Sequence, residues 1–425
     1  MNNADFLKFK KLLNFAVKNT RSDFYRAKYG QAGFDCQRDL KSTADIAKIP
    51  LLTKKELSDA PPDKLLFLKE EDAGHISRTS GTTGKPLLTF RPKQEKSTGF
   101  ETIKGVDFGR AMILANPFQA GKLYMKIKSK TKYALVVGDI HKLSESCLMA
   151  AHLQIKTLLT TATLAVILKE YLQKHPEFQK SLKYFLLSGE LVTPAKKKLL
   201  KELYPNADFF VSYGTGETGP IAFQCSRLSK KDDAIMFHPR LADYHFEIVN
   251  PDNRQAAGFD EKGEVILTDF WNNATPLIRY KTGDMASFHK NDCSCGAPGP
   301  LLQLWGRINH DFVRAGGFEI RKDMLEKPLL NLRSYVREGF EAHIYETFIN
   351  TKPRIKIALN LSLKNGVAPS PGLKKKILDE FMENCRLSPG FNLKAAVEAG
   401  LFEPPQINFV EFPLSAKAQG ILILH

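Results

Sequence analysis

The sequence lacks any long hydrophobic run. None of its apolar stretches reaches the roughly 18 residues that a membrane-spanning helix needs, so no membrane span is expected. The N-terminal segment also lacks the apolar block and small-residue cleavage site of a secretory signal, which makes a cytoplasmic location the default expectation. What this segment has instead is the spacing of an amphipathic helix, carried by Phe6, Phe9, Leu12, Leu13 and Ala16.

Basic residues are numerous, but they are not concentrated. The chain has 62 Lys and Arg against 46 Asp and Glu, a formal net charge of +16, which would suit nucleic acid, a membrane surface or an anionic substrate. No basic block alternates with aromatic residues as in proteins that bind single strands, so nucleic-acid binding is not expected. The lysines at 196–198 follow Thr193 and Pro194, a good N-cap and first-turn pair. We interpret them as a solvated helix face.

Internal repeats and low-complexity tracts are absent, and strand-like and helix-like segments alternate up to about residue 300. A helix is predicted from Thr157 to His175. Strands are predicted at 133–139, 184–190, 207–214, 244–250 and 263–270. This alternation is typical of an α/β fold with parallel strands.

A polar, glycine-bearing segment at 307–317 marks a predicted domain boundary. Further strand and helix patterns follow it, including "RIKIALNLSL" and an amphipathic helix that begins near Leu373. We therefore expect a large N-terminal domain of several subdomains over 1–308. A small, mobile α+β domain is expected over 309–425.

The stretch "SRTSGTTGKP", residues 77–86, combines hydroxyls, glycines and a lysine. It departs from the Walker phosphate loop, because Thr79 stands five positions before Gly84 and Pro86 follows Lys85. The proline disfavours a helix at this point, and apolar residues on both sides predict a loop between two strands. Flexible backbone amides, hydroxyls and one positive charge suit a polyphosphate, although many ordinary turns have a similar composition.

Three further motifs occur in order along the chain: "VSYGTGETGP" at 211–220, "PLIRYKTGD" at 276–284 and "WGRINHDFVRAGG" at 305–317. Each alone is compatible with turn glycines, a solvated acid or a surface arginine. Together with the loop at 77–86, in this order and spacing, they resemble the adenylate-forming superfamily over nearly the whole chain. Two features resemble its phenylacetate-CoA ligase branch: the segment "LLNFAVKNTRSDFYRAKY", and a Cys-x-Cys-Gly element after "PLIRYKTGD".

The resemblance implies an ATP-dependent ligase. A carboxylate attacks the α-phosphate of ATP, which gives acyl-AMP and pyrophosphate, and the acyl group then passes to CoA. The family pattern assigns phosphate contacts to Thr79, Ser80, Gly81, Thr82, Thr83, Gly84 and Lys85. It assigns adenine contacts to Gly189, Tyr213 and Gly214, with Glu190 and Thr215 as further nucleotide-binding residues. Mg²⁺ is assigned to Glu217, and the ribose to Asp284 with Arg307 beside it.

The C-terminal motif departs from the family pattern. Family members carry a lysine in a Ser-x-Gly-Lys setting that contacts the acyl-phosphate oxygens, and here Lys417 follows Ala416 instead of glycine. Asn309 stands at the hinge position in place of the usual aspartate or lysine, and Gly216 in place of a hydroxyl residue. Two alternatives therefore stay open: acyl transfer to an amine or a protein, and a nucleotide-binding homologue with impaired catalysis.

The cysteines form two groups. Cys36, Cys147 and Cys385 stand alone in mixed or helical contexts and are interpreted as core thiols. A Cys₃His set suited to structural Zn²⁺ would consist of Cys225, His238, Cys293 and Cys295. Some relatives in the phenylacetate-CoA ligase branch share this arrangement, and four unrelated residues are the alternative. His245 and His289 compete with His238 as the nitrogen ligand.

Several properties stay open from the sequence. The segment at 108–138, where the substrate pocket is expected, differs from the pattern of ligases for aryl acids. The expected partners are a small carboxylic acid and CoA or another acyl acceptor. The identity of the acid is not specified, and a homodimer is one of the open oligomeric states.

Overall fold

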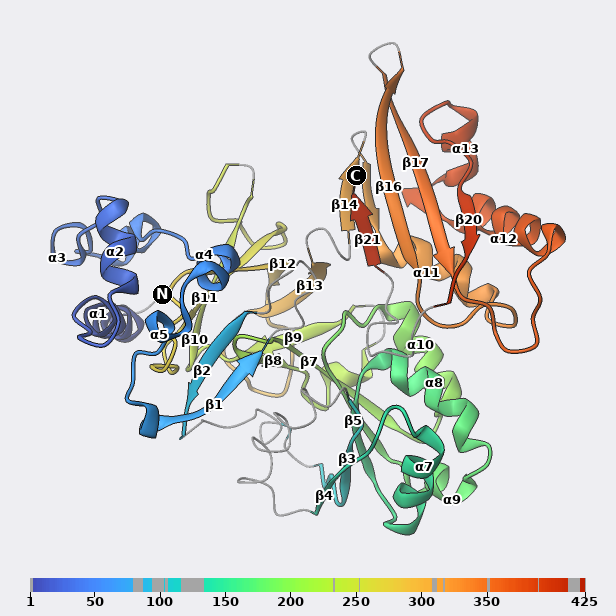
Figure 1. Cartoon of the computed structure of the whole chain (residues 1–425), viewed down its shortest axis with the longest axis horizontal. Helices are drawn as coiled ribbons and strands as arrows, with labels where there is room; N and C mark the ends of the chain where they lie inside the picture. Colours follow the sequence, from blue (N-terminus) through green and yellow to red (C-terminus); the bar gives the residue numbers. More distant parts are fainter. Residues whose placement is uncertain are drawn as a thin grey trace.

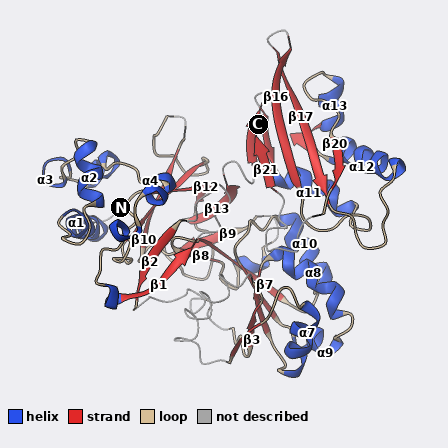
Figure 2. Cartoon of the chain, viewed as in Figure 1, coloured by secondary structure: helices blue, strands red, loops and turns tan. Residues whose placement is uncertain are grey.

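The computed structural model of the chain describes residues 3–78, 87–93, 103, 106–115, 134–231, 234–251, 253–307, 312–315, 318–349, 352–388, 390–411 and 421–424. Figures 1 and 2 show its arrangement. No helix within these ranges is both long and apolar enough to cross a membrane.

A mixed sheet is the largest element in the described residues, with 11 strands in the order β10-β11-β12-β13-β9-β8-β7-β6-β5-β3-β4. Its parallel half consists of β3 (Ala111–Ile113), β4 (Leu135–Val137), β5 (Thr157–Thr160), β6 (Tyr184–Leu187) and β7 (Asp208–Thr215). Its antiparallel half consists of β8 (Gly219–Phe223), β9 (Met236–Pro239), β10 (Tyr244–Val249), β11 (Gly263–Asp269), β12 (Tyr280–His289) and β13 (Leu301–Arg307).

The α/β prediction is confirmed, but the prediction of parallel strands is wrong for the second half of the sheet. The connection from β7 to β8 is a turn of residues 216–218. A parallel pair needs a crossover of a dozen or more residues, so this short connection forces β8 to run antiparallel to β7.

Four helices lie together beside the parallel strands in Figure 1: α7 (Leu143–His152), α8 (Ala162–Leu172), α9 (Pro176–Ser181) and α10 (Pro194–Leu203). The helix predicted from Thr157 begins later than expected, because residues 157–160 form the buried strand β5. Thr161 then caps α8 by accepting a hydrogen bond from the backbone N–H of Leu164 at 3.2 Å. A short apolar run does not distinguish a buried strand from the first turn of a helix.

Helix α10 begins as predicted, with Thr193 accepting a hydrogen bond from the backbone N–H of Lys196. The interpretation of its lysines as a solvated face is wrong, however. Lys196 is 4% exposed and Lys197 is fully buried, and only Lys198 of the three is exposed. Nζ of Lys196 lies 3.5 Å from Glu326 of a later helix and 4.0 Å from Glu338, and Lys197 donates to the backbone carbonyl of Lys231.

The N-terminal helices cover one edge of the antiparallel half. They are α1 (Asn3–Val17), α2 (Phe24–Gln31), α3 (Cys36–Asp39), α4 (Lys54–Asp59) and α5 (Pro62–Leu65), with the short 3₁₀ turns η1 (Thr43–Lys48) and η2 (Glu70–Asp72). A further 3₁₀ turn, η4 (Leu228–Lys230), follows β8. The amphipathic pattern of α1 is confirmed, because Phe9, Leu12, Leu13 and Ala16 are buried. They share a core with Leu277, Ile278 and Tyr280 of the motif "PLIRYKTGD", which fixes that motif against the N-terminal segment.

The loop at 79–86 lies outside the described residues, but its flanks do not. β1 (Ala73–Arg78) and β2 (Leu88–Pro92) form an antiparallel pair, as predicted for the strands on either side of the loop.

The C-terminal part has its own sheet of four strands in the order β20-β17-β16-β21, among the described residues. Its elements are β14 (Phe312–Ala315), β15 (Phe318–Arg321), α11 (Lys322–Asn331), β16 (Glu341–Ile349), β17 (Lys352–Leu361), α12 (Pro371–Asn384), β18 (Arg386–Ser388), β19 (Phe391–Asn392), α13 (Leu393–Glu398), β20 (Gln406–Phe409) and β21 (Ile421–Leu424). The buried side chains between 320 and 407 form a cluster separate from those of the large sheet. The boundary after residue 308 lies outside the described residues and stays a prediction.

Candidate active site and metal centre

The hairpin of β7 and β8 carries the glutamate motif. Thr215 pairs with Gly219 across the hairpin, so residues 216–218 form its turn. The two strands approach so closely at Gly214 that an added Cβ would lie 2.3 Å from the carbonyl oxygen of Gly219. This contact requires glycine at that position of the motif.

Glu217 lies at the tip of this hairpin and is 2% exposed. Its Oε1 accepts a hydrogen bond from the hydroxyl of Tyr280 at 3.0 Å. Burial and the neighbouring carboxylate raise the pKa of Tyr280 well above its usual value, so the phenol stays a proton donor. Among the described residues, Oε2 of Glu217 has no hydrogen bond or ion pair. The Glu217 carboxylate is therefore fixed through one oxygen and retains the other for a ligand.

A second group of side chains lies where β7, β12 and β13 meet. The hydroxyl of Tyr213 donates to Oδ2 of Asp284 at 2.8 Å. Nε of Arg307 lies 3.2 Å from Oδ1 of the same carboxylate, and the two residues are register partners on β12 and β13. The attraction of Asp284 raises the pKa of Arg307 further, so the guanidinium is permanently charged. A carboxylate has about four lone-pair sites, so Asp284 can accept hydrogen bonds from several donors at once.

Gly189 and Glu190 follow β6, which is the direct neighbour of β7. Gly189 has φ of +90°, a backbone conformation that favours glycine. Their position is therefore beyond the carboxyl end of a parallel strand, next to the strand that carries Tyr213. In open α/β sheets ligands bind at this edge.

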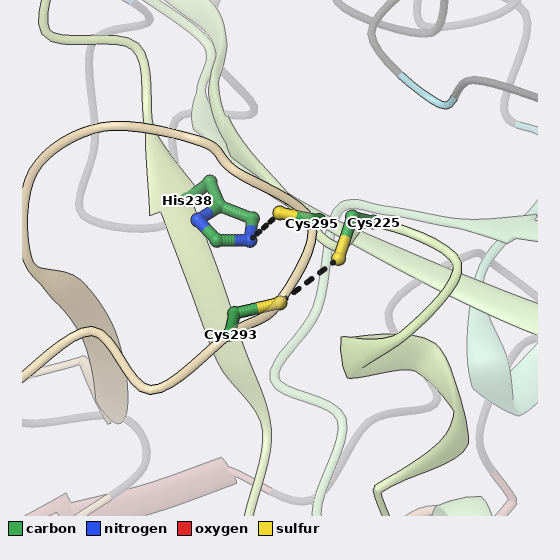
Figure 3. A group of neighbouring side chains, drawn as sticks. All are labelled: Cys225, His238, Cys293 and Cys295. Carbon is green, nitrogen blue, oxygen red and sulfur yellow. Dashed lines mark hydrogen bonds between the residues drawn. The ribbon is translucent and has the colours of Figure 1, made fainter.

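The predicted metal ligands form one cluster, shown in Figure 3. Sγ of Cys225 lies 3.5 Å from Sγ of Cys293, and Sγ of Cys295 lies 3.2 Å from Nε2 of His238. All four ligand atoms lie within 4.8 Å of one another. A tetrahedral Zn²⁺ with ordinary bond lengths would separate two sulfurs by about 3.8 Å and a sulfur from a nitrogen by about 3.6 Å. The observed spacing is close to these values.

Two backbone amides support the thiol groups of this cluster. The N–H of Leu228 points to Sγ of Cys225, and the N–H of Ala297 points to Sγ of Cys295, each at 3.4 Å. Gly296, with φ of +78°, makes the turn that brings the second amide into place. Such N–H···S contacts orient the thiolate ligands of metal sites.

The choice among the three histidines is settled by their environments. Partial burial lowers the pKa of His238, which favours the neutral imidazole that a metal requires. His245 packs edge-on against Phe9 with ring centroids 5.1 Å apart. His289 binds Ser287 through Nε2 at 2.7 Å and approaches Asp260 through Nδ1. Within the described chain only His238 faces the cysteines.

No family profile matches the chain. In sequence it is 25% identical over 349 residues to a phenylacetate-coenzyme A ligase of Thermus thermophilus, which covers 77% of this chain and 75% of that protein. It is 27% identical over 275 residues to one of Aromatoleum evansii, and this match spans 58% of each chain. In structure it superposes on a 2-hydroxyisobutyryl-CoA ligase in the postadenylation state, in complex with 2-HIB-AMP, with a TM-score of 0.72. The sequence identity is 16%, and the superposition covers 96% of this chain and 87% of that one.

The chain has the adenylate-forming CoA-ligase fold. The resemblance to phenylacetate-CoA ligases, first noted from the N-terminal segment and the Cys-x-Cys-Gly element, is confirmed by the similarity over three quarters of the chain. A further structure of the same 2-hydroxyisobutyryl-CoA ligase, with 2-HIB-AMP and CoA, superposes with a TM-score of 0.62.

The adenylate-forming fold brings together most of the predicted residues that the structure describes. Tyr213, Gly214, Thr215 and Glu217 lie on one hairpin, and Asp284 and Arg307 lie on the strands beside it. The predicted residues outside the described ranges are 79–85, Asn309 and Lys417.

Sequence reasoning missed Tyr280 and Thr282, although both lie in the quoted motif "PLIRYKTGD". Tyr280, Thr282 and Asp284 alternate along β12 and are all buried, so they share one face of the strand. Their alternation was the available indication. The buried arginine on β2, Arg91, was also missed, and no sequence pattern pointed to it.

Proposed function

We propose that the protein is an AMP-forming acid–thiol ligase, which activates a small carboxylic acid with ATP and transfers the acyl group to CoA. The observation that carries the proposal is the hydrogen-bonded group of Tyr213, Asp284 and Arg307 next to the fixed carboxylate of Glu217. The curated relatives are named phenylacetate-coenzyme A ligases, and the 2-hydroxyisobutyryl-CoA ligase of similar fold holds an acyl-adenylate and CoA.

In this proposal the charged residues have separate tasks. Asp284 accepts hydrogen bonds from the ribose hydroxyls, and Arg307 orients that carboxylate. Residues 79–85 contact the phosphates, and Lys85 stabilises the charge that develops on the leaving pyrophosphate. Tyr213, Gly214 and Thr215 border the adenine together with Gly189 and Glu190, which follow the neighbouring strand β6. Lys417 contacts the acyl-phosphate oxygens during adenylation.

Mg²⁺ fits Glu217, because a carboxylate oxygen is the ligand it prefers and Oε2 has no partner among the described residues. When bound, the ion neutralises charge on the phosphates. The hydroxyl of Tyr280 keeps the carboxylate from turning away from the ligand.

Zn²⁺ fits the cluster of Cys225, His238, Cys293 and Cys295. Four protein ligands leave no open position, so the metal would be structural and would take no part in the chemistry. Cys225 follows β8 and the other cysteines precede β13, so the metal would join the hairpin of Glu217 to the strand of Arg307.

The decisive experiment is ATP–pyrophosphate exchange with a panel of carboxylic acids, followed by the CoA dependence of AMP release. Lys85→Ala and Glu217→Ala are expected to remain folded by circular dichroism and to lose exchange by a factor of about 10² or more, because each loses a charge-assisted contact at the transition state. Exchange at the wild-type rate in both variants would contradict these assignments.

A second candidate is a nucleotide-binding homologue with impaired catalysis, which Asn309 and Ala416 favour because they depart from the ligase pattern, and a third is transfer of the acyl group to an amine or a protein. The third candidate is distinguished by exchange that occurs normally while AMP release depends on an amine instead of CoA. An impaired homologue would bind ATP and show no exchange with any acid.

A further inference from the structure

Arg91 is a buried arginine on β2, and it is 4% exposed. It lies a few residues after the loop at 77–86, which is called the phosphate loop below. Its Nη1 donates to the backbone carbonyl of Glu217 at 3.2 Å, and its Nη2 donates to the carbonyl of Thr218 at 3.2 Å. It therefore contacts the two consecutive peptide groups at the tip of the β7–β8 hairpin.

Asp269 holds Arg91 in this position. Its Oδ2 lies 3.4 Å from Nη1 of Arg91, and its Oδ1 accepts from the backbone N–H groups of Trp271 and Asn272 at 2.9 and 3.1 Å. The carboxylate is fully buried at the end of β11. The arginine is thus oriented by a carboxylate that is itself fixed to the backbone.

Glu217 is consequently held from two sides. The phenol of Tyr280 binds its side chain, and the guanidinium of Arg91 binds its main chain. The hydroxyl of Tyr244 adds a contact to the carbonyl of Thr218 at 3.4 Å. A rotation of the two peptide groups at 217–219 would break two charge-assisted hydrogen bonds in a buried environment, which makes such a rotation costly.

We infer that Arg91 is a positioning residue, which sets the Glu217 carboxylate for its ligand and couples the base of the phosphate loop to the glutamate hairpin. The inference rests on the proposed role of Glu217 in holding Mg²⁺. Arg91 acts through the backbone of Glu217 and has no assigned contact with the nucleotide.

The test separates positioning from stability. Arg91→Met leaves Asp269 buried without its cation, so this variant is expected to melt at a lower temperature. Arg91→Met/Asp269→Asn removes the unpaired charge and keeps the Oδ1 acceptor for Trp271 and Asn272, so it is expected to regain stability. Neither variant has the donors to the carbonyls of Glu217 and Thr218.

Two constants are measured at a temperature at which every variant is folded. The first is the Mg²⁺ concentration that half-saturates ATP–pyrophosphate exchange. The second is the affinity for Mn²⁺ in the presence of a non-hydrolysable ATP analogue, which water proton relaxation measures. Loss of an outer-shell partner typically changes metal affinity 10- to 100-fold. We expect both constants to weaken about 10-fold in Arg91→Met and to stay weak in the double variant, with partial recovery in Arg91→Lys.

Arg240→Met is the matched control. Arg240 donates to the carbonyl of Pro220 at 3.2 Å and pairs with Asp243 at 2.6 Å, so it makes the same kind of contacts beyond the hairpin tip. Its two constants should equal those of the wild type. Wild-type constants in the double variant would overturn the inference. Glu217→Gln reports on the proposed function separately: unchanged Mn²⁺ affinity there would remove Glu217 as the metal ligand, whatever Arg91 does.

Discussion

Glu326 on α11 offers a quantitative test of how the C-terminal sheet is attached to the large one. Its Oε2 accepts from the hydroxyl of Thr193 at 3.1 Å, and its Oε1 lies 3.5 Å from Nζ of Lys196 and 3.8 Å from Nζ of Lys322. The side chains of Lys196, Lys322 and Glu326 are 5%, 1% and 9% exposed. One carboxylate from α11 therefore lies beside two buried ammonium groups, one of them on α10, and the latter also lies 4.0 Å from Oε2 of Glu338.

Glu326→Gln keeps the volume of the side chain and removes its charge. Breaking a buried ion pair by removing one partner typically costs about 3–5 kcal/mol, because the remaining charge has no compensation. We expect the free energy of unfolding at pH 7, from urea denaturation, to fall by about this amount. A matched control is Glu170→Gln, because Glu170 also joins the two parts, through Lys364 at 3.0 Å, but is 65% exposed. Exposed pairs contribute about 0–1 kcal/mol.

The same reasoning predicts a pH dependence. Although burial raises it, the ammonium groups of Lys196 and Lys322 hold the pKa of Glu326 below its usual value. A lowered pKa in the folded state means that the stabilisation is present above about pH 4.3, the ordinary value, and disappears as the pH falls through the folded-state pKa. The difference between wild type and Glu326→Gln should therefore shrink in acid. A loss under about 1 kcal/mol at pH 7, or an equal loss in Glu170→Gln, would refute the reasoning.

Three further outcomes are expected. Protein purified without added metal should contain about one zinc per chain. A strong chelator or Cys293→Ser should lower the melting temperature, since metal binding adds to folding stability. Zinc well below one per chain, together with an unchanged melting temperature in Cys293→Ser, would contradict the site. Lys417→Ala should slow acyl-AMP formation and largely spare thioester formation from supplied acyl-AMP, because the contact proposed for the lysine belongs to the first half-reaction. An equal loss in both half-reactions would contradict that proposal. Gly214→Ala should unfold at distinctly lower urea than wild type, because its Cβ would lie 2.3 Å from the oxygen of Gly219; an unchanged midpoint would show that the hairpin tolerates the side chain.

Features that depend on neighbours in sequence were predictable. The amphipathic spacing of α1, the Thr193 cap of α10 and the Cys-x-Cys-Gly turn each depend on a few consecutive residues, and the structure confirms them. The order and spacing of the four motifs were also sufficient to suggest the fold. These features follow from local backbone geometry and side-chain period, which the sequence states directly.

Features that depend on residues far apart in sequence were decided by the tertiary structure. Lys196 and Lys197 resemble solvated lysines because nothing near them in sequence indicates their partners, which are Glu326 of α11 for Lys196 and the carbonyl of Lys231 for Lys197. Residues 157–160 form a strand because β3 and β6 lie on either side to pair with them, and an apolar run alone does not reveal those partners.

The candidate site shows the same division. The sequence by itself determined the candidate residues and their chemical types: Glu217, Asp284 and Arg307, and a set of cysteines and histidines suited to zinc. Only the tertiary structure decided that Tyr213 binds Asp284, that Arg91 binds the main chain of Glu217, and that His238 faces Cys295 while His245 and His289 do not. The physical reason is that residue type sets the chemistry a group can do, whereas its partners are set by strand register and helix packing between distant segments.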